Sequence, residues 1–178
     1  NVEELLTSLI ELLHASMGKG DELITVEEEL KYLRNYISIQ EFKYYDKFKV
    51  HFDIQPETRK YKILKFILQP LVENAIKHGI YPKSEGGTVS ISVCREKDSI
   101  KILISDDGAG MPQAMADSIL DGQAEISGIG IRNVDKRLKK HYGCGLKIVS
   151  EVDKGTTFEI TIPYHKTDEG STNGRDAG

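Results

Sequence analysis

The stretch Leu68–Gly79, with the sequence LQPLVENAIKHG, decides how the rest of the chain is interpreted. Its apolar residues recur at three- and four-residue spacing, which predicts an amphipathic helix with one buried stripe. The remaining arc carries a carboxylate, an amide, an ammonium and an imidazole, on Glu73, Asn74, Lys77 and His78. Residues three and four apart on a helix are neighbours, so these groups could together address a metal, a phosphate and a proton. The alternative is an ordinary surface face that ends at a Gly79 C-cap.

The composition describes a globular protein with one domain and an appendage. The chain has 178 residues, of which 39% are hydrophobic and 29% charged, enough to bury a sizeable core. A net charge of −4 argues against nucleic acid as a partner, because a nucleic-acid groove needs a basic face. No apolar run approaches the roughly 18 residues of a membrane span, and no signal-peptide pattern is found. Because Asn1 rather than Met comes first, we expect a fragment of a longer protein.

The first 45 residues predict two helices, and we interpret them as the remnant of a separate helical region. Apolar residues recur at helical spacing in residues 1–17. Thr25 and Glu28 then form a capping-box pattern, so a second helix is expected to run to about Tyr45. Its apolar residues, in near-heptad spacing, are Val26, Leu30, Leu33, Ile37 and Tyr44. This stripe predicts either a seam against another helix or subunit, or packing on the chain's own domain.

Residues 46–164 alternate between strand and helix patterns, and we expect them to form the main domain. Period-two alternation predicts a strand at 48–54 and two hairpins, 88–95 with 100–105 and 146–152 with 156–162. One helix is expected from about Ile63 to His78, where Pro70 either bends it or marks its first turn. Another is expected between residues 128 and 143. Hairpins with helices on one face of the sheet predict an α+β two-layer sandwich, followed by a disordered tail at 165–178.

Two glycine-rich loops and a threonine turn carry further chemistry. Asp106 ends a predicted strand, where its carboxylate can accept a hydrogen bond from an exocyclic amine such as that of adenine. Gly108 and Gly110 then let the backbone approach a ligand. Gly128 and Gly130 open a helix, where free backbone amides favour phosphate. A plain Asp-Gly turn is the alternative for the first loop.

The segment between the two glycine loops has few apolar residues, which predicts a flexible lid over a ligand. Further along, the run Gly155–Phe158 (GTTF) enters the last strand, where Thr156 could reach a nucleobase. An ordinary hairpin is the alternative there. The sequence contains neither a Walker A loop nor the glycine fingerprint of dinucleotide-binding domains. The two cysteines, Cys94 and Cys144, lack metal-binding spacing and indicate reduced thiols.

Taken in order, these four signals resemble the ATP-binding motifs of the gyrase, heat-shock chaperone, histidine kinase and MutL superfamily, whose fold is the Bergerat fold. The matching runs, for the N, G1 and G2 boxes and the closing Gly-Thr element, are 73–78 (ENAIKH), 106–110 (DDGAG), 128–131 (GIGI) and 155–158 (GTTF). Within the superfamily, Leu68–Gly79 and Glu29–Gln40 (ELKYLRNYISIQ) are similar to sensor histidine kinases of the LytS-like type. Residues 1–45 would then derive from the dimerisation and phosphoacceptor region.

The resemblance implies an ATP-dependent protein-histidine kinase with ATP and Mg²⁺ as cofactors. Asn74 would coordinate Mg²⁺, Asp106 would bind the adenine amine, and Lys77 would contact phosphate. Glu73 matches the general base of the ATPase relatives, or only orients a Mg²⁺-bound water. The other residues expected to bind the nucleotide are His78, Gly108, Gly110, Gly128, Ile129, Gly130, Ile131 and Thr156.

The family's phosphoacceptor histidine lies in an upstream box that this sequence lacks. Only His14 precedes the expected catalytic domain, and its neighbours are not those of an acceptor, so a half-exposed helix histidine is the alternative. We therefore expect the acceptor upstream, and expect the fragment to bind nucleotide without phosphorylating itself efficiently. The resemblance implies a response-regulator aspartate as partner, a homodimer in the full-length protein, a cytoplasmic location, and membrane contact only through the missing N-terminal region.

Two other functions fit parts of the sequence. An anti-sigma-factor serine kinase has the same ATP fold, although the helices expected at 1–45 argue against it. A nucleotide-sensing interaction module without transfer activity is the other, and the intact Asn74 and Asp106 argue against a degenerate site.

Overall fold

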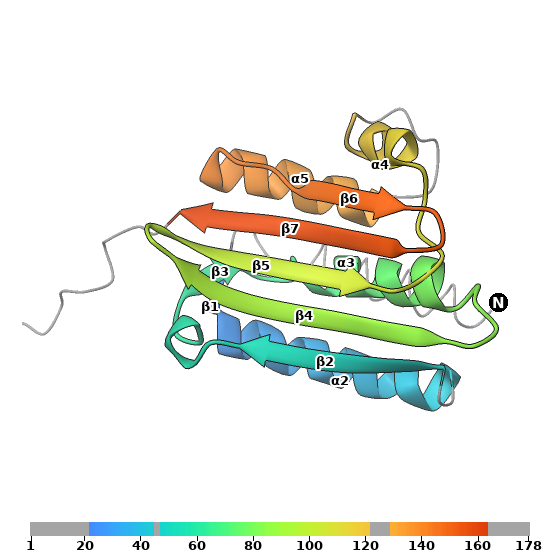
Figure 1. The fold of residues 1–178 in the computed structure, drawn as a ribbon. Coiled ribbons are helices and arrows are strands. Elements are labelled where there is room, and N and C mark those ends of the chain that lie inside the picture. Colours follow the sequence, from blue (N-terminus) through green and yellow to red (C-terminus); the bar gives the residue numbers. More distant parts are fainter. Residues whose placement is uncertain (1–21, 45–46, 122–128, 164–178) are drawn as a thin grey trace, which may run out of the picture.

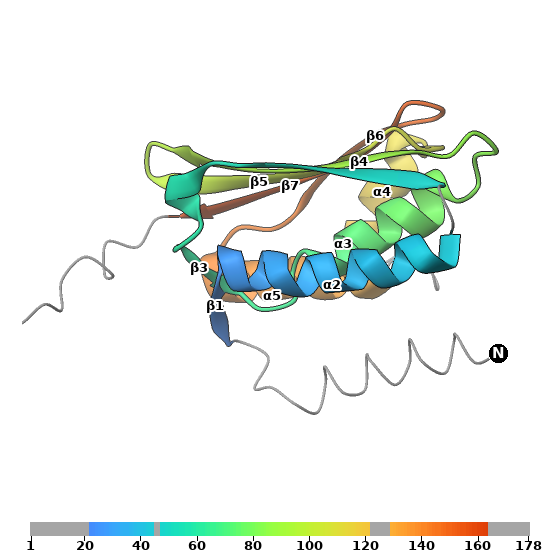
Figure 2. The same cartoon turned by 90° about the horizontal axis from the view of Figure 1, so that it is seen from below.

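The computed structural model describes residues 22–44, 47–121 and 129–163. One layer is a five-stranded sheet; in spatial order its strands are β2 (Phe48–Ile54), β4 (Gly87–Glu96), β5 (Ser99–Asp106), β7 (Gly155–Pro163) and β6 (Lys147–Glu151) (Figure 1). The helices are α2 (Val26–Tyr44), α3 (Gln69–Asn74), α4 (Gln113–Leu120) and α5 (Ile129–Tyr142). Figure 2 shows all four helices on one side of the sheet. The predicted α+β two-layer sandwich is therefore confirmed.

Both predicted hairpins are present. Strands β4 and β5 pair antiparallel and turn between Glu96 and Ser99, and strands β6 and β7 turn between Glu151 and Gly155. The prediction was incomplete for β2, which pairs in parallel with β4. A parallel pair needs a crossover, and here the chain crosses through α3. The fold thus contains one β-α-β unit that period-two patterns alone do not reveal.

Helix α2 begins with the predicted capping box. The Thr25 hydroxyl accepts from the Glu28 amide at 3.2 Å, and the Glu28 carboxylate accepts from the Thr25 amide at 2.8 Å. The four apolar residues Val26, Leu30, Leu33 and Ile37 are at most 5% exposed and belong to the main core, against which Tyr44 also packs. Of the two alternatives for this stripe, packing on the chain's own domain is the one observed.

The core lies between the sheet and the helices. Alternate residues of β4, β5 and β7 are buried, because successive side chains of a strand point to opposite faces. The buried strand residues are Val89, Ile91, Val93, Ile100, Ile102, Ile104, Phe158, Ile160 and Ile162. They meet the apolar stripes of α3 and α5, whose buried residues include Leu71, Val72, Ile131, Val134 and Leu138. This contact fixes the helices against the sheet face.

The prediction that a helix begins at about Ile63 is wrong. Lys62–Leu64 forms β3, which pairs antiparallel with β1 (Leu23–Thr25) in a separate two-stranded sheet. Three-residue strands are too short to give a period, so their apolar residues merged with the helix pattern. Helix α3 begins only at Gln69, with Pro70 in its first turn, where the missing amide hydrogen costs nothing.

Helix α3 continues directly into a π-helix at Ala75–Ile80. The Tyr81 amide donates to the Ile76 carbonyl at 2.8 Å, five residues back. Single π turns inside helices are frequent at functional sites. Gly79 is therefore not the C-cap that the sequence offered as an alternative, because it lies inside this turn.

Several predictions lie outside the described residues. These are the helix at 1–17 with His14, the tail at 165–178, and Gly128. Among the helices of the described ranges, none is both long and apolar enough to cross a membrane. Cys94 and Cys144 are unpaired, half-buried thiols.

Candidate functional site

The Asp106 side chain is buried at the carboxyl end of β5 and is only 5% exposed. Its Oδ1 accepts the Gly108 amide at 2.9 Å, whereas its Oδ2 is buried and has no hydrogen-bond partner in the described part of the chain. Burial raises the pKa of this carboxyl to about 6, against the opposing effect of the Gly108 and Thr156 amides. A buried acceptor without a donor is costly, so this oxygen fits a ligand that brings an N–H group.

Gly79 and Gly108 let three backbone segments meet around this carboxylate. A Cβ on Gly79 would lie 2.5 Å from Asp106 Oδ1, and a Cβ on Gly108 would collide with the Gly79 carbonyl group. The Ala109 amide donates to that carbonyl oxygen at 2.8 Å, which fixes the glycine loop to the π-helix. The site therefore requires glycine at both positions for close approach.

Thr156 lies opposite Asp106 in the β5–β7 pairing and is 4% exposed. Its hydroxyl is 2.9 Å from the Ser150 hydroxyl, which donates to the Gly155 carbonyl and accepts from the Met111 amide. Either hydroxyl can be the donor in this pair; when Ser150 gives its single proton to the Gly155 carbonyl, Thr156 donates to Ser150 and keeps its lone pairs to accept. Thr156 then presents an acceptor beside Asp106, as adenine or a bridging water requires.

Gly110 follows the same loop with a φ of +59°, in the left-handed region that favours glycine. A Cβ there would collide with the Glu151 carbonyl. The neighbouring Ala109 carbonyl accepts the Asp153 amide at 2.7 Å. Gly110 therefore serves to dock the loop on the β6–β7 turn, and through that turn it supports Thr156.

The polar face of α3 and the π-helix is only partly solvated. Glu73 and Lys77 form an ion pair and are 25% and 29% exposed, while Asn74 is half-buried and His78 is exposed. The Tyr36 hydroxyl of α2 is buried without a hydrogen-bond partner in the described chain. Burial raises the pKa of Tyr36, and the nearby Glu73 charge raises it further. Glu73 therefore has Lys77 and α2 as neighbours, so Lys77 balances the carboxylate before any phosphate arrives.

Gly130, in the first turn of α5, lies against the start of α3. A Cβ on Gly130 would lie 3.4 Å from the Pro70 side chain, so the first turns of α5 and α3 are adjacent. Ile131 is buried in the core and Ile129 is 54% exposed. The predicted lid contains α4 within its described part, where Ala116 and Ile119 are buried. Its remainder, 122–128, is outside the described residues.

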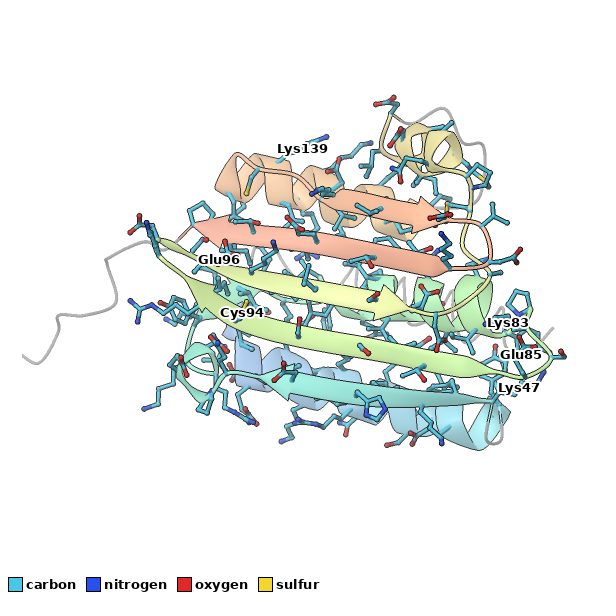
Figure 3. All side chains as sticks on the ribbon, in the orientation of Figure 1. Lys47, Lys83, Glu85, Cys94, Glu96 and Lys139 are labelled. Atoms are coloured by element: carbon cyan, nitrogen blue, oxygen red, sulfur yellow. The ribbon has the colours of Figure 1, made fainter. Side chains whose placement is uncertain are left out.

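Two lysines, Lys47 and Lys83, form hydrogen bonds that fix the loop between the π-helix and β4. Figure 3 shows Lys47, Lys83 and Glu85 together where β4 begins. Lys83 donates to the Asp107 carbonyl at 2.8 Å and lies 3.7 Å from the Glu85 carboxylate. The charge of Lys83 also lowers the pKa of Asp106 slightly. Sequence patterns gave no signal for Lys83, since a lone loop lysine is usually solvated.

A magnesium ion would find few protein ligands here. The described residues contain no cluster of three or more His, Cys, Asp or Glu side chains that could hold a metal. Mg²⁺ commonly binds through one or two protein oxygens together with substrate phosphates and water. Asn74, half-buried on α3, is the residue that the sequence resemblance assigns to such an arrangement.

Residues 60–166 match the family described as histidine kinase-, DNA gyrase B- and HSP90-like ATPases. The chain belongs to this ATPase family. Residues 1–48 match a second family, described as histidine kinase. The resemblance inferred from the four motifs is therefore confirmed at the level of the family.

Curated relatives of this ATPase-family chain are sensor histidine kinases. It is 34% identical over 164 residues to sensor histidine kinase YesM of Bacillus subtilis, an alignment that covers 91% of this chain and 28% of YesM. It is 28% identical over 172 residues to sensor histidine kinase/phosphatase LytS of Staphylococcus aureus, covering 93% of this chain and 30% of LytS. The chain thus spans less than a third of the length of these two relatives.

Solved structures show the same fold. The histidine kinase AdeS of Acinetobacter baumannii superposes with a TM-score of 0.65 at 16% identity, covering 92% of this chain and 80% of AdeS. The mycobacterial sensor histidine kinase MprB gives a TM-score of 0.63 at 16% identity, covering 80% of this chain and 97% of that one. The fold class inferred from the sequence therefore matches that of histidine kinase catalytic domains.

Proposed function

We propose that the chain is the ATP-binding catalytic region of a two-component sensor histidine kinase. The observation that carries this proposal is the buried Asp106 Oδ2, which lacks a donor in the described chain and lies where Gly79 and Gly108 let the backbone approach the carboxylate closely. The 6-amine of adenine supplies the missing donor. Membership of an ATPase family and similarity to sensor histidine kinases support the same assignment.

Each site residue has a role in this proposal. Asp106 accepts the adenine amine, and Thr156 accepts directly or through water. Asn74 supplies an oxygen to Mg²⁺. Lys77 moves from Glu73 toward the phosphates when ATP is present, and the backbone amides at Gly128 and Gly130 add phosphate contacts.

The chemistry is phosphoryl transfer, which depends chiefly on positioning and on neutralising charge. Mg²⁺ would supply positive charge at the ATP phosphates. The chain's own residues hold the adenine at the buried Asp106 and Thr156 and bring the polar face of α3 to the phosphates. Glu73 becomes free to orient a water or accept a proton once Lys77 leaves it.

The remaining assignments concern the longer protein. The γ-phosphate passes to a histidine upstream of this chain and then to an aspartate of a response regulator. We divide the chain into 1–45 from the dimerisation region, of which α2 packs on the catalytic core, 46–164 as the catalytic domain, and a tail. Because ATP and response regulators are cytoplasmic, we place this region there, with a homodimer and membrane contact supplied by segments outside it.

A binding and labelling experiment tests the proposal. The 178-residue chain is titrated with a fluorescent ATP analogue, with Mg²⁺ and then with EDTA, and is separately incubated with radiolabelled ATP. We expect binding that Mg²⁺ strengthens about tenfold or more, and little self-labelling. No nucleotide binding would reject the proposal. Strong acid-labile labelling that is lost in His14→Ala would instead move the acceptor into this chain, and acid-stable labelling of a candidate partner protein added to the same assay would indicate a serine kinase.

A further inference from the structure

Helix α2 carries a buried carboxylate that the proposed mechanism does not use. Glu29 is 1% exposed. Its Oε2 accepts the Phe66 amide at 2.8 Å, and its Oε1 accepts the Leu68 amide at 3.0 Å. Burying a carboxylate is costly unless its oxygens are paired, so this side chain is held by the loop that it binds.

That loop, residues 65–68, leads directly into α3. Phe66 has a φ of +57°, which a non-glycine residue adopts only at a cost. Leu68 is the N-cap of α3 and provides no side-chain cap. The first amides of a helix need an outside acceptor. Glu29 therefore caps α3 from a distant helix, and it stabilises the strained residue before the cap.

The same loop is held from the opposite side by α5. Arg137 donates to the Lys65 carbonyl at 2.7 Å and to the Phe66 carbonyl at 3.4 Å. Burial raises the pKa of Glu29, whereas the loop amides and the Arg137 charge oppose that rise. The amides of the loop thus bind α2 and its carbonyls bind α5, so the start of α3 is fixed between the two helices. Figure 2 shows α2, α3 and α5 in one layer on the same side of the sheet, and Figure 1 shows α3 between the other two.

Tyr36 of α2 is buried nearer the other end of α3, with no hydrogen bond from its hydroxyl within the described chain. Tyr36 lies seven residues after Glu29, on the same face of α2, and its buried hydroxyl lies in the field of Glu73. Glu73 and Asn74 end the α-helical part of α3. The hydrogen bonds of Glu29 therefore relate the position of α2 to that of α3 and Asn74, and Tyr36 adds only its packing against the same core.

We propose that Glu29 is a positioning residue that fixes α3 to α2, so that the placement of α2 sets the placement of Asn74 against Mg²⁺-ATP. This inference rests on the proposed role of Asn74 and adds a route by which the helix preceding the catalytic domain controls it. Asp106 and Gly108 are not contacted by Glu29 or by its loop in any hydrogen bond described above. Asp106 lies at the far end of the π-helix, where Gly79 and Gly108 hold it, so the adenine site should depend on Glu29 much less than Asn74 does.

The test is the affinity of the 178-residue chain for ATP in Mg²⁺ and in EDTA, for wild type, Glu29→Gln, Arg137→Gln and Glu41→Gln. Glutamine has the shape of glutamate but turns an amide N–H₂ group toward one loop amide. We expect the gain in affinity from Mg²⁺ to fall at least fivefold in Glu29→Gln and to fall in Arg137→Gln. Affinity in EDTA should stay within twofold of wild type. Glu41, which is exposed on the same helix, is the matched control and should change neither value.

The outcomes separate the two proposals. A wild-type chain that binds no nucleotide rejects the proposed function. If wild type binds ATP, the positioning role alone is tested by Glu29→Gln. That role is overturned if the affinities of this variant for ATP in Mg²⁺ and in EDTA fall equally, or if neither falls. If Glu29→Gln does not fold, Arg137→Gln decides, because it releases the same loop from its other side; an unchanged Mg²⁺ gain in that variant overturns the inference.

Discussion

Asp106→Asn is expected to weaken ATP binding about 100-fold at pH 7.5. The variant replaces the buried acceptor Oδ2 with an N–H₂ group, so two donors face each other where the adenine amine binds. A factor of 100 corresponds to about 2.7 kcal/mol, within the range for a hydrogen bond to a charged group together with an unpaired donor. Isothermal titration measures the change. Asp107→Asn is the matched control, because Asp107 is exposed and can keep its Thr88 contact through the amide oxygen; a loss in Asp107→Asn as large would contradict the account.

The pKa of the Asp106 carboxyl predicts how ATP binding depends on pH. Its pKa of about 6 means that it is ionised, and able to accept from the amine, above that value. Below it, the protonated acid turns a donor toward the adenine. The advantage of wild type over Asp106→Asn should therefore fall about tenfold from pH 7 to pH 5. Taking the ratio of the two proteins cancels the titration of the ATP phosphates, and a ratio constant over this range would exclude the carboxylate as the acceptor.

Asp106→Asn should not lower the free energy of unfolding of the protein without ATP. The folded pKa of Asp106 lies above its ordinary value of 3.8, so its proton stabilises the fold at low pH and this contribution is lost as pH rises through about 6. At pH 7.5 the buried charge costs up to about 3 kcal/mol, which the neutral asparagine avoids in part. Urea unfolding of Asp106→Asn at that pH should give a free energy equal to or above that of wild type. A clear loss would mean that the weaker binding reflects a damaged fold.

Asn74→Ala is expected to abolish the gain in ATP affinity that Mg²⁺ provides. Alanine removes the only oxygen that we assign to the metal, while the adenine pocket stays intact. Affinity in Mg²⁺ should fall about tenfold or more, to the value measured in EDTA, and affinity in EDTA should not change. Asn35→Ala, on the exposed face of α2, is the control. An unchanged Mg²⁺ gain in Asn74→Ala would assign the metal to another group.

Much of the sheet follows from local sequence. The alternation in 88–105 and 146–162 sets each hairpin, because its strands are neighbours along the chain. The parallel pairing of β2 with β4 escaped prediction because it depends on a crossover. The three-residue strands β1 and β3 escaped because each exists only through pairing with a segment far along the chain.

The residues of the site likewise divide into those that local sequence indicates and those that depend on tertiary packing. Asp106 and the glycines were found because each motif is contiguous, and residue type alone indicates a bare acceptor or a close approach. The role of Gly79 was missed, because its constraint is the Asp106 side chain on another element. Glu29 stood in a recognised motif, but its burial and its loop partners depend on tertiary packing. Ser150, which orients Thr156, gave no signal of its own.

The central claim is that the bare oxygen of Asp106 accepts the 6-amine of adenine. The most direct measurement compares ATP with inosine triphosphate, which carries an oxygen in place of that amine, on wild type and Asp106→Asn. Wild type should prefer ATP by about 30-fold or more, because a carboxylate and a carbonyl oxygen repel. In Asp106→Asn the amide can donate to the inosine oxygen, so the preference should disappear or reverse. If wild type binds the two nucleotides with affinities within threefold of each other, Asp106 does not read the adenine and the account is contradicted.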